Sequence, residues 1–280
     1  MREDQVGKRT RAVPATAIAA GAGAVGTLLA ATAIAASPAH AIIGGVDATE
    51  EYPFMAALYD DGGEHYCGGA LVSGEWVVTA GHCTEPEEIT VRVGSADRLE
   101  GGGERGVAEV VLHPGFEVID VGDDPAYPIS EYLLRNDLAL LRLDAPVDDR
   151  VPVAIAAASP SPGATVRGLG WGMVDEFGEE EKPVTLQELD TGIVPLDRCA
   201  DVDAGGDLCS EHPTERAQMC VTDSGGPMLR RGAYGWELVG VVSRDGDFDV
   251  NPACVGPMAI TDTAAHADWI ASVITSAHAR

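Results

Sequence analysis

The stretch Asp223-Ser224-Gly225-Gly226-Pro227 decides how this chain is interpreted. It is not decisive alone, because aspartate, serine and glycine are also ordinary turn residues. Two upstream strings give it meaning: Thr79-Ala80-Gly81-His82-Cys83 and Asn136-Asp137-Leu138-Ala139-Leu140-Leu141. A histidine, an aspartate and a serine thus follow one another in an order that is rarely accidental.

Together these three residue types can activate a serine. A serine hydroxyl is a weak nucleophile at neutral pH and needs a neighbouring base to take its proton. An imidazole suits that task because its ordinary pKa lies near neutral pH, and a buried carboxylate can hold the imidazole in the correct tautomer. We therefore assign Ser224 as the nucleophile, His82 as the general base and then acid, and Asp137 as the orienting carboxylate.

The three strings resemble those of the trypsin/chymotrypsin family of serine proteases, as found in its secreted, bacterial-type members. The other common serine-hydrolase signature, G-x-S-x-G with a Ser-Asp-His order, is absent around Ser224. The resemblance extends over nearly all of Ile42 to Ile274. Besides the three strings it rests on Cys67-Gly68-Gly69, His113-Pro114, Gly170-Trp171-Gly172 and Val194-Pro195-Leu196.

This resemblance implies an all-β fold with two six-stranded antiparallel β-barrels and a C-terminal helix. A protease domain would span residues 42–280, with barrels at about 42–150 and 151–262 and the helix at about 264–276. The active site would lie in the cleft between the barrels.

The residue pattern agrees with this fold, because many short apolar segments are separated by turn residues. Asp60-Asp61-Gly62-Gly63 predicts a hairpin. The last segment places apolar residues at helical spacing, which predicts a packing helix. The predicted strands are Pro53–Tyr59, His65–Val72, Trp76–Thr79, Ile89–Val93, Val107–Leu112, Leu138–Leu143, Val166–Leu169, Leu186–Val194, Pro227–Leu229, Leu238–Ser243 and Met258–Thr261.

The resemblance also assigns an oxyanion hole and a support for the triad. The hole would use the backbone N–H groups of Thr222 and Ser224, and the Ser243 hydroxyl would support Asp137. The family overwhelmingly has glycine where this chain has Thr222, whose branched β-carbon narrows the allowed backbone. Since loss of one oxyanion donor costs on the order of 10²–10³ in rate, a catalytically weak homologue that binds a protein partner remains the alternative.

Residues 1–41 have the pattern of a secretory signal peptide. Lys8, Arg9 and Arg11 form a basic start, and an apolar stretch then leads into A-x-A cleavage patterns. A membrane anchor is the rival interpretation, which the alanine-rich composition disfavours. Cleavage after Ala41 would release the mature chain, whereas cleavage after residue 35 would leave residues 36–41 as a short propeptide.

The string Ile42-Ile43-Gly44-Gly45 resembles the start of the mature enzymes in this family. There the new α-ammonium group folds inward and pairs with the aspartate before the catalytic serine, which implies an ion pair between Ile42 and Asp223. A buried charge needs such a partner. Ala41 replaces the usual Lys or Arg before the isoleucine, so trypsin-type autoactivation is not expected.

Charge limits the classes of partner. Without the first 41 residues, 239 of the 280 remain, with 14 basic and 43 acidic side chains and a net charge of −29. A chain this acidic is not expected to bind nucleic acid, which needs basic patches. We expect a soluble charged surface, with attraction of cationic substrates as the alternative. The expected partners are protein or peptide substrates, without a stable membrane anchor once the signal peptide is removed, and the expected state is an extracellular monomer.

Six cysteines follow the leader, which indicates disulfides, although the count alone allows 15 pairings. No C-x₂-C pair is present, so a zinc site is not expected. The family resemblance selects the pairs Cys67–Cys83, Cys199–Cys209 and Cys220–Cys254.

The resemblance places Gln218 at the floor of the pocket that holds the side chain before the cleaved bond. Because an uncharged floor cannot neutralise a buried Arg or Lys, strict trypsin specificity is disfavoured. Met219 and Met258 would make the pocket shallow and apolar. The wall beyond Ser243 begins Arg244-Asp245 in place of the expected Trp-Gly, and Asp245 with Asp247 and Asp249 could attract a basic residue at the pocket mouth.

The loop Ser95–Glu104 resembles the calcium loop of trypsins, with Glu100 and Glu104 at suitable positions. Ser95 replaces an acidic ligand, and calcium prefers several carboxylate or carbonyl oxygens. We therefore expect no cofactor and a solvent-exposed structural loop, with a structural calcium ion as the alternative. The acidic segments 120–131, 176–181 and Asp201–Asp207 are expected to be solvated loops.

These observations lead to one preferred hypothesis, a secreted serine endopeptidase that acts through an acyl-enzyme and is not strictly specific for Arg or Lys. The complete triad favours it over the binding homologue, because a pure binding module does not need all three residues.

Overall fold

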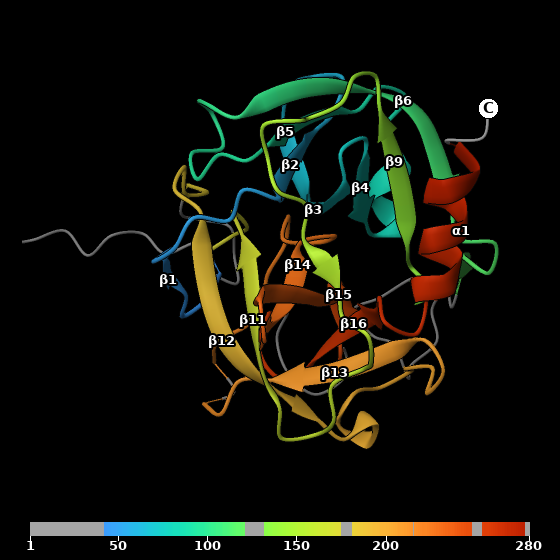
Figure 1. Ribbon diagram of the computed structural model, residues 1–280. Helices are drawn as coiled ribbons and strands as arrows, with labels where there is room; N and C mark the ends of the chain where they lie inside the picture. The colour runs from blue at the N-terminus through green and yellow to red at the C-terminus, as the bar shows by residue number, and fades with distance from the viewer. Residues whose placement is uncertain (1–41, 121–131, 175–180, 215, 248–253, 278–280) are drawn as a thin grey trace, which may run out of the picture. The chain divides into compact units, whose positions relative to one another are not determined.

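The first barrel is closed and antiparallel, with its strands in the order β2-β3-β4-β9-β6-β5 (Figure 1). The structure is a computed structural model that describes residues 42–120, 132–174, 181–214, 216–247 and 254–277. The strands of this barrel are β2 (Met55–Tyr59), β3 (His65–Ser73), β4 (Trp76–Thr79), β5 (Thr90–Val93), β6 (Gly103–Leu112) and β9 (Ala139–Leu143).

The second barrel follows the order β12-β11-β14-β15-β16-β13 and closes through the pairing of β12 with β13. Two short strands extend this sheet: β1 (Val46–Asp47) pairs with β12, and β10 (Ala154–Ile155) runs parallel to β15. The six barrel strands are β11 (Thr165–Gly170), β12 (Gln187–Val194), β13 (Asp207–Glu211), β14 (Pro227–Gly232), β15 (Gly235–Asp245) and β16 (Met258–Asp262).

The helix α1 (Ala267–Ala277) ends the described chain and packs on the core that contains the first barrel. It begins later than predicted because Asp262 Oδ1 first accepts the backbone N–H groups of Ala264 and Ala265, which holds that segment in a turn. The prediction of two six-stranded antiparallel barrels and a C-terminal helix is therefore confirmed. Among the described residues, no helix is long and apolar enough to cross a membrane.

The remaining elements are short. Strands β7 (Glu117–Asp120) and β8 (Tyr132–Arg135) form a separate antiparallel pair. Two 3₁₀ turns complete the set, η1 (Gly81–Thr84) and η2 (Leu196–Arg198). The predicted signal peptide lies outside the described residues, and so do residues 121–131 and 176–180 of the predicted acidic loops.

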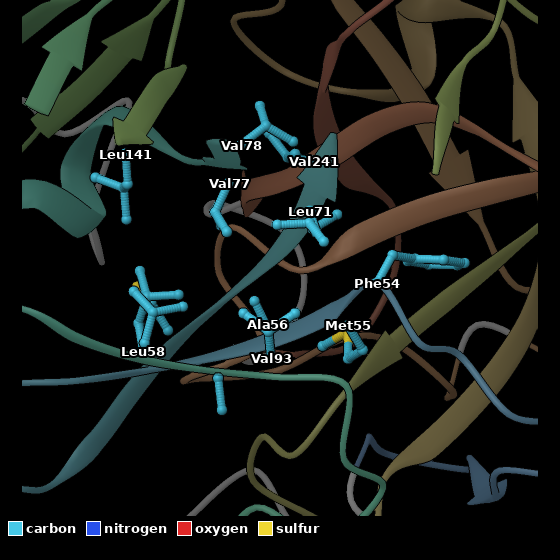
Figure 2. Close-up of a cluster of buried hydrophobic side chains, with 14 of the residues drawn as sticks. Phe54, Met55, Ala56, Leu58, Leu71, Val77, Val78, Val93, Leu141 and Val241 are labelled. Atoms are coloured by element: carbon cyan, nitrogen blue, oxygen red, sulfur yellow. The ribbon is translucent and has the colours of Figure 1, made fainter. Parts of the chain in front are cut away.

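The larger core joins the two barrels. Figure 2 shows part of it, with side chains of β2, β3 and β4 around Leu58 and Leu71 and with Val241 of β15 in the same cluster. Strand β2 is buried at every position, and so is β4. A second cluster around Ile42, Met219 and Ile260 fills the other part of the second barrel. Because side chains of both barrels share the first cluster, the surface between them is fixed by packing.

Strand β15 contains an irregularity that matters for the site. Val242 pairs with Ile260 and Arg244 with Ala259, so Ser243 is an extra residue in the ladder. In a regular strand, neighbouring side chains point to opposite faces, and a bulge changes their direction. Here both Ser243 and Arg244 are buried.

Three disulfides are present: Cys67–Cys83, Cys199–Cys209 and Cys220–Cys254. They are the same pairs that the resemblance implies. The first joins β3 to the turn that carries His82, and the third joins the segment before Ser224 to the wall after β15.

One acidic segment differs from the prediction. Asp201–Asp207 was expected to be a solvated loop, but Asp207 is buried and begins the unpredicted strand β13. Its carboxylate is tolerated there because it forms an ion pair with Arg244.

Candidate active site

The carboxylate of Asp137 lies at the centre of the site. It follows β8, directly before β9, and is fully buried. Its Oδ1 accepts the backbone N–H of His82 at 2.9 Å, and its Oδ2 lies 2.8 Å from His82 Nδ1. Ser243 Oγ donates to the same Oδ2 at 2.7 Å. Three predicted site residues from three separate parts of the chain are thus brought together.

The electrostatics of this pair keep the aspartate charged. Burial disfavours the ionised carboxylate, but the nearby charge of His82 and the hydrogen bonds from His82 and Ser243 outweigh it, so the pKa of Asp137 is below its ordinary value. Burial lowers the pKa of His82, but the charge of Asp137 and the hydrogen bond with it raise this pKa by more. The net pKa of His82 is therefore above the ordinary value. With 26% of its side chain exposed, His82 remains reachable from solvent.

Ser224 is held by its backbone beside this pair. Its carbonyl accepts the N–H of Gly68 at 2.8 Å, which ties the nucleophile loop to β3 of the first barrel. Gly225 then has φ of 76°, and a Cβ there would lie 2.1 Å from Thr79 Oγ1, so the position requires glycine. In the described part of the chain, Ser224 Oγ makes no hydrogen bond to His82 Nε2, a link that is often long in the absence of substrate.

Thr222 has a backbone conformation that glycine adopts readily and other residues rarely adopt. Its φ is 73°, in the left-handed region where a β-branched residue is an outlier. Its Oγ1 is buried without a hydrogen-bond partner among the described residues. Within the same residues, neither the N–H of Thr222 nor that of Ser224 has an acceptor, so both predicted oxyanion donors are unused. The left-handed backbone and the unpartnered hydroxyl thus both make threonine unfavourable at this position.

Asp223 is a fully buried carboxylate between these two residues. It accepts the N–H groups of Gly172 at 2.7 Å and Cys220 at 2.9 Å, and a Cβ on Gly172 would lie 2.4 Å from it. Burial raises the pKa of Asp223 to about 7, although these two hydrogen bonds lower it. It has no ion-pair partner among the described residues, so the predicted pairing with Ile42 stays a prediction.

Ile42 lies inside the second barrel. It is fully buried with φ of 70°, and the next residue, Ile43, exchanges two backbone hydrogen bonds with Gln218 at 3.1 and 3.0 Å. The residues that begin the predicted mature chain therefore pack against the segment that leads to the nucleophile.

A cavity of about 150 Å³ opens next to Ser224. Met219, Met258 and Asp245, three of the residues assigned to the substrate pocket, line it. Gln218 is not among its lining residues; its amide donates to the carbonyl of Pro257 at 2.7 Å, and it lines a separate, smaller cavity. Met219 and Met258 line this smaller cavity as well as the one beside Ser224.

The described part of the wall at the end of β15 holds two acidic residues, Asp245 and Asp247. The Asp245 carboxylate accepts the N–H of Asp247 at 3.0 Å and that of Cys254 at 3.2 Å. Burial raises its pKa to about 6, and the charge of Asp247 adds to this. Asp249 lies outside the described residues.

The loop that resembles a calcium site, Ser95–Glu104, binds the side chain of Arg92 from β5. Arg92 Nη2 pairs with Glu104 at 2.7 Å, and its Nη1 donates to the carbonyl of Gly101 at 2.8 Å. The Ser95 hydroxyl donates to the carbonyl of Glu100. Two oxygens that could bind calcium are thus occupied by a guanidinium group.

Sequence reasoning missed two contributors to the site. Thr261 Oγ1 donates to the carbonyl of Asp137 at 3.1 Å, and Arg244 Nη1 donates to Ser243 Oγ at 3.2 Å. The replacement of Trp-Gly by Arg244-Asp245 was noted in the sequence, but it does not reveal that Arg244 points inward.

Comparisons with known proteins agree with this geometry. A family model described as "Trypsin" matches residues 42–270. Human kallikrein-8 is 33% identical over 236 residues, which cover 80% of this chain and 82% of that protein. Trypsin epsilon of Drosophila erecta is 31% identical over 216 residues, which cover 72% and 76%. Coagulation factor XII of Rattus norvegicus is 34% identical over 257 residues, but the chain spans only 40% of its length.

Proposed function

Because this chain belongs to the trypsin family of serine peptidases, we propose that it is an endopeptidase that hydrolyses peptide bonds through an acyl-enzyme. The observation that carries the proposal is the fully buried Asp137 carboxylate bonded to the partly exposed imidazole of His82. Such a pair prepares a base for proton transfer, and Ser224 lines the adjoining cavity.

The proposed reaction begins when Ser224 Oγ attacks the carbonyl carbon and His82 Nε2 takes its proton. Asp137 stabilises the imidazolium that forms, and Ser243 keeps the carboxylate in place. His82 then returns the proton to the leaving amine. Water repeats the two steps on the acyl-enzyme and releases Ser224.

The negative oxygen of the tetrahedral intermediate would be bound by the N–H groups of Thr222 and Ser224. Both are unused in the described structure. Thr222 keeps the left-handed conformation that glycine adopts at low cost, so the donor survives the substitution.

The pocket favours small or medium uncharged side chains before the cleaved bond. Met219 and Met258 line the cavity beside Ser224, and Gln218 does not. A buried Lys or Arg side chain would lack a carboxylate below it and would be disfavoured. The alternative, a basic residue held near Asp245, requires that carboxylate to leave its two backbone hydrogen bonds.

We also propose secretion and processing before Ile42. The three disulfides fit an oxidising compartment. Cleavage would convert the buried nitrogen of Ile42 to an ammonium group, a suitable partner for the buried Asp223 carboxylate. The assignment to bacterial-type members stays a prediction, because the relatives described above are animal proteins.

The second candidate function is a catalytically weak homologue that binds a protein partner. The strained Thr222 favours it. Incubation of the mature protein with a mixed peptide library separates the two functions. We expect cleavage after small or medium uncharged residues, and none by the matched Ser224→Ala variant.

Other outcomes of the same experiment have distinct meanings. Dominant cleavage after Arg or Lys would refute the pocket argument while leaving the endopeptidase intact. Absence of cleavage by a protein confirmed to begin at Ile42 would support the binding homologue. Equal cleavage by both proteins would show a contaminating protease.

A further inference from the structure

The guanidinium group of Arg244 is buried next to the triad, with only 5% of its side chain exposed. Its Nη2 pairs with Asp207 Oδ2 at 2.8 Å and donates to the carbonyl of Asp201 at 2.9 Å. Its Nη1 donates to Ser243 Oγ at 3.2 Å. A buried arginine is costly unless it is paired, so this arrangement must be held by specific contacts.

The bulge in β15 explains how adjacent side chains reach the same interior region. Ser243 is the extra residue between Val242 and Arg244, which face consecutive residues of β16. The local change of direction lets Ser243 reach Asp137 while Arg244 reaches Asp207 on β13. The adjacent residues Ser243 and Arg244 of β15 therefore connect Asp207 of β13 to the triad.

We propose that Arg244 is a positioning residue, which orients His82 through the Ser243 hydroxyl and the Asp137 carboxylate. A guanidinium group has only donors, so the hydrogen bond from Arg244 must end on a lone pair of Ser243 Oγ. The hydroxyl proton of Ser243 is then directed to Asp137 Oδ2, the same oxygen that faces His82 Nδ1.

The charge of Arg244 also acts on His82, at the end of this series of hydrogen bonds. It lowers the pKa of His82, against the larger opposing influence of Asp137 and that of Glu85. Asp207 pairs with this positive charge at the far end. The charges of Asp262, Asp207 and Asp203 also act on His266, whose pKa burial lowers. Arg244 thus helps to keep the base neutral and ready to accept a proton.

The inference deepens the proposed function and rests on it for its catalytic meaning, but the orientation of His82 can be measured without catalysis. We would titrate the imidazole nitrogens of the mature protein by ¹⁵N NMR and assign His82 with a His82→Gln variant. The same proteins would be treated with a fluorophosphonate probe, and the labelling rate of Ser224 would be measured against pH.

Three variants separate charge from packing. Asp207→Asn leaves the charge of Arg244 without its partner, so we expect the titration midpoint of His82 to move to lower pH. The double variant Asp207→Asn/Arg244→Gln removes both charges and keeps amide donors, so its midpoint is expected above that of Asp207→Asn. At pH 6 a higher midpoint leaves less of the neutral His82 base. We therefore expect the ratio of the labelling rate at pH 6 to that at pH 8 to be roughly threefold lower in the double variant than in Asp207→Asn.

Arg244→Lys tests orientation while the positive charge is kept. A lysine can reach one partner but lacks the planar fork that contacts both Ser243 and Asp207. We expect an unchanged midpoint of His82 and a labelling rate at pH 8 that is lower by roughly tenfold. The control is Arg198→Gln/Glu211→Gln, which removes an exposed ion pair and should change neither quantity.

Equal midpoints for Asp207→Asn and the double variant would overturn the proposed influence of Arg244 on His82. An unchanged labelling rate in Arg244→Lys would overturn its positioning role. If Asp207→Asn does not fold, the double variant and wild type provide the comparison, with the higher midpoint expected in the double variant. Expected midpoints without labelling of the wild type would support the inference and contradict the proposed catalytic function.

Discussion

Substitution of Thr222 by glycine should stabilise the protein, because it removes two unfavourable features of this residue. Thr222 has φ of 73° and a buried hydroxyl without a partner among the described residues. A left-handed backbone costs a non-glycine residue roughly 1–2 kcal/mol, and an unsatisfied buried hydroxyl costs about 1–3 kcal/mol. Glycine removes both costs.

The gain is reduced by the larger conformational entropy of glycine in the unfolded chain, about 0.5–1 kcal/mol. The net expectation for Thr222→Gly is a free energy of unfolding higher by about 2 kcal/mol, or a Tm higher by about 4–8 °C for a domain of this size. Thr222→Ala removes the hydroxyl but keeps a β-carbon in the left-handed region, so its stability should lie between the two.

The assay is guanidinium unfolding in a Ser224→Ala background, which prevents self-digestion. Thr165→Gly is the control, because Thr165 lies exposed in β11 without a positive φ, and glycine there should destabilise. In the active background, Thr222→Gly should label at least as fast as wild type, because the backbone donor remains. A Thr222→Gly protein that is no more stable than wild type would refute the strain argument.

Three further predictions concern pH, specificity and calcium. Burial raises the pKa of Asp223 in the uncleaved chain to about 7, above its value in the unfolded chain. The contribution of Asp223 to the free energy of unfolding should therefore be fully present at and below about pH 4 and fall by on the order of 4 kcal/mol as pH rises to 7. Cleavage before Ile42 should abolish this loss, and identical pH profiles for both forms would contradict the ion pair. Met219→Gly should enlarge the cavity beside Ser224 and shift peptide-library cleavage towards larger aromatic residues; an unchanged preference would remove Met219 from the pocket. Because Arg92 occupies the oxygens of Glu104 and Gly101, calcium and EDTA should leave the Tm unchanged, and a higher Tm with calcium would disprove this.

The sequence predicted the barrels because strand formation here follows local patterns. Apolar segments such as β2 and β4 are buried along their whole length, and the turn between β2 and β3 is fixed by Asp60, whose Oδ1 accepts the N–H groups of Gly62 and Glu64. Triad candidates were found for a similar reason, since each lies in a short string next to a strand or turn.

Features that depend on distant partners were not predicted. Strand β13 begins with Asp207 in an acidic segment whose composition predicts a loop. The strand can be buried because Arg244, 37 residues away, neutralises the Asp207 carboxylate. The direction of Arg244 depends on a bulge, which no residue type in β15 specifies. Gln218 was placed at the pocket floor from the resemblance, and the structure places it at a separate small cavity that Met219 and Met258 also line.

The measurement that tests the central claim most directly is active-site labelling of the mature protein, confirmed by mass to begin at Ile42. The protein is treated with a fluorophosphonate probe beside its Ser224→Ala variant, and the adduct is mapped by peptide sequencing. We expect one adduct, on Ser224, that is absent from the variant and forms more slowly as pH falls and His82 becomes protonated. No adduct on Ser224 in the folded, correctly processed protein would contradict the activated nucleophile and favour the binding homologue.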